Sequence, residues 1–260
     1  MEEHAGSLVN LLVALEPQWL RPYLPLEVVT GWLILLLVVL VAWYSVRHMQ
    51  RVPASGWQTL AEWTYGLCNN FSRQMIGLGG ERYAPLLGTL FVYILIMNLA
   101  GLVPGLTSPT ATLNMTLALA LTAVIGSWVY GVLSRGPGYL GHFVEGVGDA
   151  PKFIWPLLVP IMIIVHLIGE FARIISLSIR LFGNIFAKET VIGQVLLLLA
   201  SVLAMHQVNL LLRAPLVLAG SALLHLPLLL LGLLVSLIQA VIFVMLTAVY
   251  IQGAVEVHAE

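Results

Sequence analysis

Long apolar runs restrict the fold of this chain more than any other sequence feature. Three of them, within 26–47, 83–104 and 113–134, reach the roughly 20 residues that cross a bilayer as an α-helix. Inside lipid, every backbone polar group must find a partner within the protein, so such runs form helices. The chain is 60% hydrophobic and 9% charged, whereas a soluble domain carries about 25% charged residues. We therefore predict an integral membrane protein with several crossings.

The predicted architecture is a single all-α membrane domain over 1–260, with about five transmembrane helices and one interfacial amphipathic helix. The interfacial helix is predicted at 56–78, because Trp57, Leu60 and Trp63 recur at helical spacing among polar residues. The other segments are an N-terminal outside segment at 1–25, transmembrane helices at 26–47, 83–104 and 113–134, a long helix at 153–205, and a long final helix at 214–252.

The last two helices are too long to stand upright in a membrane. The final apolar run, 216–251, would be about 54 Å long as a helix, while the hydrocarbon core is about 30 Å thick. We expect both helices to tilt steeply, to curve, or to break near Pro156, Pro160 and Pro227. A tilted pair presents a broad concave flank, which favours docking against a large round partner over forming a central pore.

Basic residues are unevenly distributed between the two sides of the predicted spans. Positive residues collect in cytoplasmic loops, so we expect the richer side to be cytoplasmic, the N-terminus outside and the C-terminus inside. The acidic start of the chain has no basic n-region, and we expect no cleaved signal peptide. The richer side holds Arg47, Arg51, Arg73, Arg82, Arg135 and Lys152, and the other side holds Arg21 and Arg213.

Charged residues inside the long helix at 153–205 are the main candidates for function. Charges at membrane depth are costly and are kept with partners, water or a function. Arg180 has apolar neighbours on both sides and cannot deprotonate to escape the cost. On a helical wheel, one polar stripe contains Arg180, Arg173, Asn184, His166, Ser176 and Glu170, while Glu189 falls on the opposite side. Two carboxylates therefore lie at different depths, with Arg180 between them.

The final helix carries neutral polar groups at matching depth. Ser236, Gln239, Thr247 and Tyr250 share one face, and Gln239 can donate to or accept from a side chain on a facing helix. We expect it to hydrogen-bond the Arg180 guanidinium. Each charged candidate also has a purely structural alternative: an ion pair for Arg180, pairing of Glu189 with Lys188, pairing of Glu170 with Arg173, helix–helix contact for Gln239, and an ordinary interfacial residue for His166.

Several classes of function are excluded by composition. A net charge of −1 argues against a nucleic-acid surface. The single cysteine, Cys68, cannot form an internal disulfide or a multi-cysteine metal site. No Gly-x-x-x-x-Gly-Lys-Ser/Thr loop is present, so we expect no bound nucleotide, and we expect no cofactor or metal.

The run Ser-Leu-Ser-Ile-Arg-Leu-Phe-Gly-Asn-Ile-Phe-Ala-Lys-Glu at 176–189 resembles the signature of the a subunit of F-type ATP synthases. Segments 98–104, 109–120 and 237–250 resemble other helices and turns of that family. The resemblance implies a proton-conducting stator beside a ring of c subunits and the b subunits of the peripheral stalk. Two half-channels would load and unload the ring carboxylates, and the complex would couple proton flow to rotation and ATP synthesis.

The resemblance also implies roles for individual residues. Arg180 would separate the half-channels and pair with the ring carboxylate, and the proton path would involve Glu189, Asn184, Gln239, Glu170, His166 and Asn114. Two positions depart from some members of the family, which have an aspartate at Thr112 and a histidine at Gly232. The ring supplies the ion site, so H⁺ and Na⁺ both stay open, with the proton as the default.

Two rival functions remain to be weighed, and one location is expected. A stand-alone ion channel or transporter would predict internal repeats or a self-contained pore, neither of which is visible in the sequence. A non-conducting assembly subunit of a membrane complex would tolerate loss of Arg180. We expect the protein in a bacterial inner membrane, bound by lipid.

Overall fold

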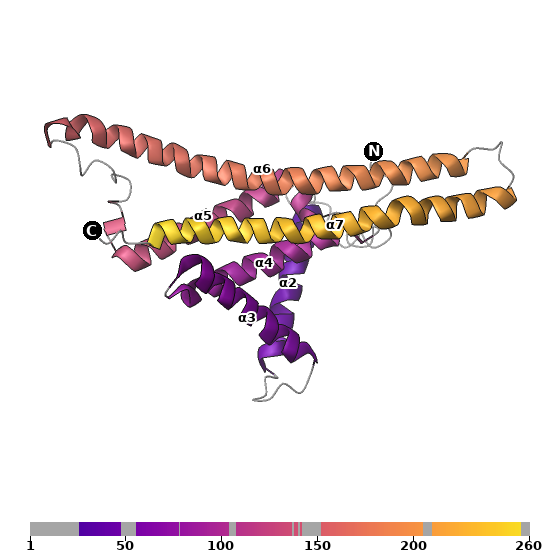
Figure 1. The fold of residues 1–260 in the computed structure, drawn as a ribbon, viewed down its shortest axis with the longest axis horizontal. Helices are drawn as coiled ribbons and strands as arrows, with labels where there is room; N and C mark the ends of the chain where they lie inside the picture. The colour runs from indigo at the N-terminus through magenta and orange to yellow at the C-terminus, as the bar shows by residue number, and fades with distance from the viewer. Residues whose placement is uncertain are drawn as a thin grey trace, which may run out of the picture.

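The computed structural model describes residues 26–47, 56–77, 79–103, 108–136, 138–139, 141, 152–204 and 210–255, and the expected outside segment at 1–25 falls outside them. The described part is helical and has no strand, which confirms the all-α prediction. Its helices are α2 (Leu26–Arg47), α3 (Gly56–Ile76), α4 (Ala84–Ala100), α5 (Leu113–Arg135), α6 (Trp155–Ala204) and α7 (Leu210–Val255), with short 3₁₀ turns η1 (Gly80–Tyr83), η2 (Pro109–Ala111) and η4 (Lys152–Ile154) (Figure 1).

Five helices of the described chain are long and apolar enough to cross a membrane, namely α2, α4 with η1, α5, α6 and α7. Helix α3 is not among them, because it mixes polar residues with exposed Trp57 and Trp63. Aromatic residues of this kind collect at the membrane–water interface. The chain is therefore a multi-pass membrane protein with one amphipathic helix beside its spans.

Helices α6 and α7 form a hairpin of unusual length and run side by side along the long axis of the molecule, with α2, α3 and α4 near their middle (Figure 1). Their 50 and 46 residues correspond to about 75 and 69 Å of helix. Both continue without a break through Pro160 and Pro227. Since the hydrocarbon core is about 30 Å thick, and a break at these prolines is not formed, tilt and curvature stay as the two expected ways to accommodate their length.

The core lies where α4, α5, α6 and α7 meet. Helix α5 contributes mainly small buried residues, including Ala120, Ala123 and Ser127, which let neighbouring backbones approach closely, as in other membrane helix pairs. The larger side chains come from the other helices: Leu87, Leu90, Ile94 and Met97 of α4, Ile174, Leu177, Leu181 and Ile185 of α6, and Phe243, Val244 and Ile251 of α7. This packing fixes which face of α6 points inward.

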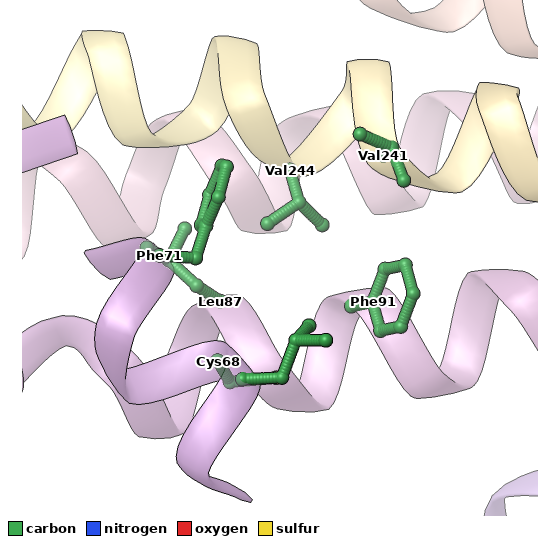
Figure 2. A pocket seen from close by; sticks show the side chains of 7 residues that line it. Cys68, Phe71, Leu87, Phe91, Val241 and Val244 are labelled. Carbon is green, nitrogen blue, oxygen red and sulfur yellow. The ribbon is translucent and has the colours of Figure 1, made fainter. Parts of the chain in front are cut away.

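An apolar cavity of about 140 Å³ opens between α3, α4 and α7 (Figure 2). Apart from the Cys68 thiol, whose pKa is raised by burial, its lining side chains are hydrocarbon: Leu67, Phe71, Leu87, Phe91, Val241 and Val244. A proton needs carboxylates, imidazoles, amides or water to move. The groups needed for transport therefore have to lie elsewhere in the bundle.

Candidate functional site

The charged side chains of α6 lie at three levels along its axis. Glu170 and Arg180 are about 15 Å apart along the helix, and Arg180 and Glu189 about 14 Å. Glu170 contacts Trp128 near the C-terminal end of α5, whereas Glu189 contacts Ser108 just before its N-terminal end. Because α5 is one of the membrane-crossing helices, the two carboxylates lie toward opposite membrane faces, with Arg180 between them.

At one level lies the Glu170 cluster, which consists of Glu170, Arg173, Trp128 and Tyr250. Glu170 is only 7% exposed, and both its carboxylate oxygens are bonded. Oε1 accepts from Arg173 Nη1 at 2.6 Å, and Oε2 accepts from Trp128 Nε1 at 3.1 Å. The Arg173 guanidinium also lies 5.1 Å from the centroid of the Tyr250 ring, within cation–π range. The expected local pair between Glu170 and Arg173 is thus part of a contact between three helices.

A cavity of about 230 Å³ adjoins the Glu170 cluster. Its wall is mainly apolar, but Glu170, Arg173, Tyr250 and Tyr139 also line it, and these polar groups could hydrogen-bond water inside it. Burial, and secondarily the negative charge of Glu170, raises the pKa of Tyr139. His166 lies one turn before Glu170, with its Nδ1 2.9 Å from the Met162 carbonyl oxygen.

At the other end lies the Glu189 cluster, which consists of Glu189, Ser108, Thr110 and Asn98. The Ser108 backbone N–H donates to Glu189 Oε1 at 2.7 Å. Ser108 Oγ donates to the Met97 carbonyl at 2.8 Å, and Thr110 Oγ1 donates to Asn98 Oδ1 at 2.7 Å. Ser108, Thr110 and Asn98 are all 0% exposed. Residues 108–110, which precede α5, are therefore buried in the protein interior beside Glu189.

Lys188 does not pair with Glu189, which was one of the alternatives. Its Nζ donates to the Asn98 carbonyl at 2.9 Å and to Ser236 Oγ at 3.2 Å, so the ammonium lies at the junction of α4, α6 and α7. Gly232 provides the room: a Cβ there would lie 3.3 Å from Lys188 Cδ and 2.7 Å from Leu102 Cδ2. The absence of a side chain at Gly232 therefore leaves space for the Lys188 side chain of α6.

Arg180 differs from every other charged group of α6. It lies on the exposed face of the helix, and no hydrogen bond or ion pair joins it to any residue of the described chain. The expected bond from Gln239 is not formed. Instead, Gln239 is 1% exposed and its Oε1 accepts from Asn184 Nδ2 at 2.6 Å. Asn114 is exposed on the first turn of α5, with no hydrogen bond to a described residue.

Several groups that contact one of the two carboxylates, or support such a contact, were not singled out from the sequence. Ser108, Thr110 and Trp128 are uncharged, and Gly101 has no side chain at all. Asn98 was noticed only as part of a family-like segment. A signal was nevertheless present in the sequence, because the turn at 107–112 is rich in serine and threonine between two apolar spans. Polar side chains at such a depth need partners within the protein.

Comparisons with known proteins agree on one family. The family model described as "ATP synthase A chain" matches residues 28–252. The chain is 37% identical to ATP synthase subunit a of Desulfotalea psychrophila over 88% of this chain and 83% of the relative. It is 35% identical to ATP synthase subunit a of Citrifermentans bemidjiense, over 89% and 88% of the two chains. Against the Geobacter sulfurreducens protein of the same name it is 35% identical, over 86% and 85%.

Proposed function

The chain belongs to the ATP synthase subunit a family, and from that membership we propose how its residues carry out the family function. The protein is the proton-translocating stator subunit of an F-type ATP synthase and is not itself a catalytic subunit. It assembles with the other subunits of that complex. In our proposal its immediate partners are the ring of c subunits, against the exposed face of α6, and the b subunits of the peripheral stalk.

The unpaired guanidinium of Arg180 is the observation that carries the proposal. A permanent cation exposed at membrane depth is costly unless a partner of opposite charge reaches it. No described residue of this chain supplies that partner. A carboxylate on a c subunit would, since an opposite charge at close range favours the ionised form of a carboxyl group. Arg180 thereby promotes release of the proton from each c subunit as it arrives.

The surface around Arg180 supports contact with a neighbouring helix. Ala172, Ser176, Gly183 and Ala187 lie on the same side of α6 as Arg180 and are small. A Cβ added at Gly183 would meet no atom within 4 Å in the chain itself. Small residues allow a partner helix to approach closely, so a c subunit can bring its carboxylate within reach of the guanidinium.

The two clusters on α6 serve as the half-channels in this proposal. Glu189, helped by Asn184 and Gln239 near Arg180 and by Asn114, takes up protons from outside. Glu170, which lines the 230 Å³ cavity, and His166, one turn before it, release them to the cytoplasm. The positive charge of Arg180 opposes a direct proton leak between the clusters. Each proton that crosses releases about 2.3 kcal/mol per 100 mV of membrane potential, which drives rotation.

The orientation of the chain is also part of the proposal. The Glu170 cluster lies beside the end of α5 that leads into the 135–152 loop, which holds Arg135 and Lys152. The Glu189 cluster includes Ser108, which belongs to a sequence segment, 104–112, that holds no charged residue. The positive-inside rule then places Glu170 toward the cytoplasm of a bacterial inner membrane and Glu189 toward the outside, with the N-terminus outside and the C-terminus cytoplasmic.

The decisive experiment replaces Arg180 in the complete ATP synthase. We expect Arg180→Ala to abolish ATP-driven proton pumping into inverted membrane vesicles, measured by quenching of a pH-sensitive dye, while the complex still assembles. Arg47→Ala is the matched control, because Arg47 is an arginine at the end of α2 that lies over Trp43. Normal coupled pumping by Arg180→Ala would refute the proposal and favour a non-conducting assembly role.

A further inference from the structure

We propose that Gly101 and Ser108 are positioning residues that hold the Glu189 carboxylate in a fixed place for proton uptake. The inference rests on the proposed function, since it assumes that Glu189 carries protons. It adds two residues that bear no titratable group and that act only through Glu189. We call Gly101, the Ser108 backbone and the space between them the carboxylate cradle.

The first element of the carboxylate cradle is a fixed hydrogen-bond donor. The Ser108 N–H lies 2.7 Å from Glu189 Oε1, a distance typical of a strong bond to an ionised group. Glu189 Oε2 accepts no hydrogen bond from a described residue. One carboxylate oxygen is therefore held, and the other is free to accept a proton.

The second element is the space left by Gly101, the residue that follows α4. A Cβ at this position would lie 2.5 Å from Glu189 Oε1 and 2.9 Å from Ser108 Cβ. Real Cβ atoms do not approach other atoms so closely, so any larger residue would displace the carboxylate. The φ of Gly101 is −70°, which other residues also adopt, so space and not backbone freedom requires glycine here.

The third element is the rigidity of the donor. Ser108 Oγ donates to the Met97 carbonyl and lies 2.6 Å from Thr110 Oγ1, which donates to Asn98 Oδ1. These bonds join the η2 turn to the end of α4 inside the protein. A donor held by buried neighbours needs no rearrangement when the charge on its acceptor changes. In the cycle, Oε2 gains a proton to form an O–H bond and then transfers that proton onward.

The donor can be removed by a single substitution. Ser108 has φ −69°, which is the value that proline requires, so Ser108→Pro fits the local backbone. It removes the N–H and places the ring Cδ where the amide hydrogen pointed toward Glu189 Oε1, so the carboxylate loses its donor and has to move away. Ser108→Ala is the matched control, because it removes the hydroxyl but keeps the N–H. The assay is ATP synthesis driven by an imposed proton gradient in proteoliposomes that contain the whole ATP synthase.

We expect Ser108→Pro to lower the rate at least about tenfold, the effect of losing a hydrogen bond to a charged group. Ser108→Ala keeps the donor but loses the Oγ bonds that help to fix it, so it should lower the rate less. Equal rates for the two variants would overturn the proposal. Glu189→Gln, assayed beside them, separates the two levels of inference. If Glu189→Gln lowers the rate and Ser108→Pro does not, only the carboxylate cradle is wrong. If Glu189→Gln has no effect, the use of Glu189 in the proposed function is wrong as well.

A second pair of variants decides the matter if Ser108→Pro does not assemble. Each variant of this pair, and its reference, also carries Ser108→Gly. This substitution removes Ser108 Cβ, the second atom that a Cβ at Gly101 would meet, and keeps the N–H. Here Glu189→Asp alone should lower the rate, because the shorter side chain no longer reaches the donor. When Gly101→Ala is also present, Glu189→Asp should raise the rate above that of the protein with Gly101→Ala and Glu189 intact. The shorter side chain relieves the contact with the new methyl group. If Glu189→Asp lowered the rate both with Gly101 and with Gly101→Ala, the proposal would be contradicted. That result is expected if Gly101→Ala damages the protein generally, because a shorter side chain at 189 would not repair such damage.

Discussion

The two carboxylates of α6, which lie at opposite ends of the proposed proton route, have very different surroundings. Glu170 has a charged donor on one oxygen and an indole donor on the other, at 2.6 and 3.1 Å. Glu189 has a single backbone donor at 2.7 Å and no ion pair with the adjacent Lys188. Both lie on the same helix, so the difference comes from the elements packed against them: α5 and α7 around Glu170, and the α4–α5 turn around Glu189.

Position in the membrane therefore does not decide how freely a carboxylate exchanges protons. Glu170 can take up a proton only if it gives up part of an ion pair, which water in the adjoining cavity would have to compensate. Glu189 keeps one oxygen free of hydrogen bonds within the described chain, so protonation there breaks no ion pair. We infer that Glu189 is the more direct carrier and that Glu170 also has a structural role.

The largest effect that tests this comparison is expected from Glu189→Gln. The amide keeps the size of the side chain but cannot carry a proton, and the loss of a positioned acid–base group costs about a hundredfold in rate. Proton flow driven by an imposed gradient should fall by that factor, while passive leak through the membrane stays low because Arg180 is intact. Glu189→Asp retains a carboxyl group but withdraws it from the Ser108 donor, so as a comparison it should lose less flow than Glu189→Gln. Unchanged flow in Glu189→Gln would remove Glu189 from the route.

Glu170→Gln should have a smaller effect on proton flow than Glu189→Gln, together with a loss of stability. The substitution leaves Arg173 half-exposed beside the cavity without its anionic partner, and weakens the contact with Trp128. We expect the midpoint of thermal unfolding of the purified complex to fall, and Trp128→Phe to reproduce part of this fall with little change in flow. If Glu170→Gln slowed proton flow more than Glu189→Gln does, the roles assigned to the two carboxylates would be reversed.

The class of fold could be predicted from the sequence because lipid leaves few alternatives. Apolar runs of sufficient length must be helices, and the aromatic pattern at 56–78 distinguished α3 from the spans. The order of Glu170, Arg180 and Glu189 along α6 could also be predicted, and a helical wheel gives the direction of each side chain around the helix axis. These predictions depend on local periodicity alone.

The partners of the charged groups could not be predicted in the same way. A wheel contains no information on how α4, α5 and α7 are placed against α6. It led to an expected bond between Gln239 and Arg180, whereas Gln239 is bonded to Asn184, one turn further along. Likewise, the bond from Ser108 to Glu189 joins residues 81 positions apart and uses a backbone N–H, for which no residue type gives a signal. The glycine at 232 is explained only by the structure, in which it leaves space for the Lys188 side chain to reach the Asn98 carbonyl.

Gly232→Ala is expected to test the close packing beside the Glu189 cluster, with a cost of about 1 kcal/mol in stability. The added methyl group would press on Leu102 and on the Lys188 side chain. Gly66→Ala in α3 is the matched control, because a Cβ there meets no atom within 4 Å and alanine favours the helix by about 1 kcal/mol. Thermal unfolding of the complex should therefore shift in opposite directions. A shift in the same direction would show that the space at Gly232 is not required.

The smallest expected effect concerns the contact between α5 and α6 at a level between the two carboxylates. Thr116 Oγ1 and Ser178 Oγ lie 3.1 Å apart in the interior, and neither group carries a charge. Interhelical hydrogen bonds in membrane proteins contribute about 0.6 kcal/mol on average, because the hydroxyls also have backbone acceptors on their own helix, as Thr116 does with the Leu113 carbonyl.

A double-mutant cycle with Thr116→Val and Ser178→Ala measures that coupling directly. We expect a coupling of about 0.6 kcal/mol in the stability of the complex and unchanged proton flow in all three variants. This level lies beside Arg180 along α6, so a loss of flow would mean that protons pass through the α5–α6 interface and not only through the two clusters. The comparison between Glu170 and Glu189 would then describe the ends of a continuous path within this chain, and Arg180 would no longer be the point at which the ring of c subunits has to carry the proton.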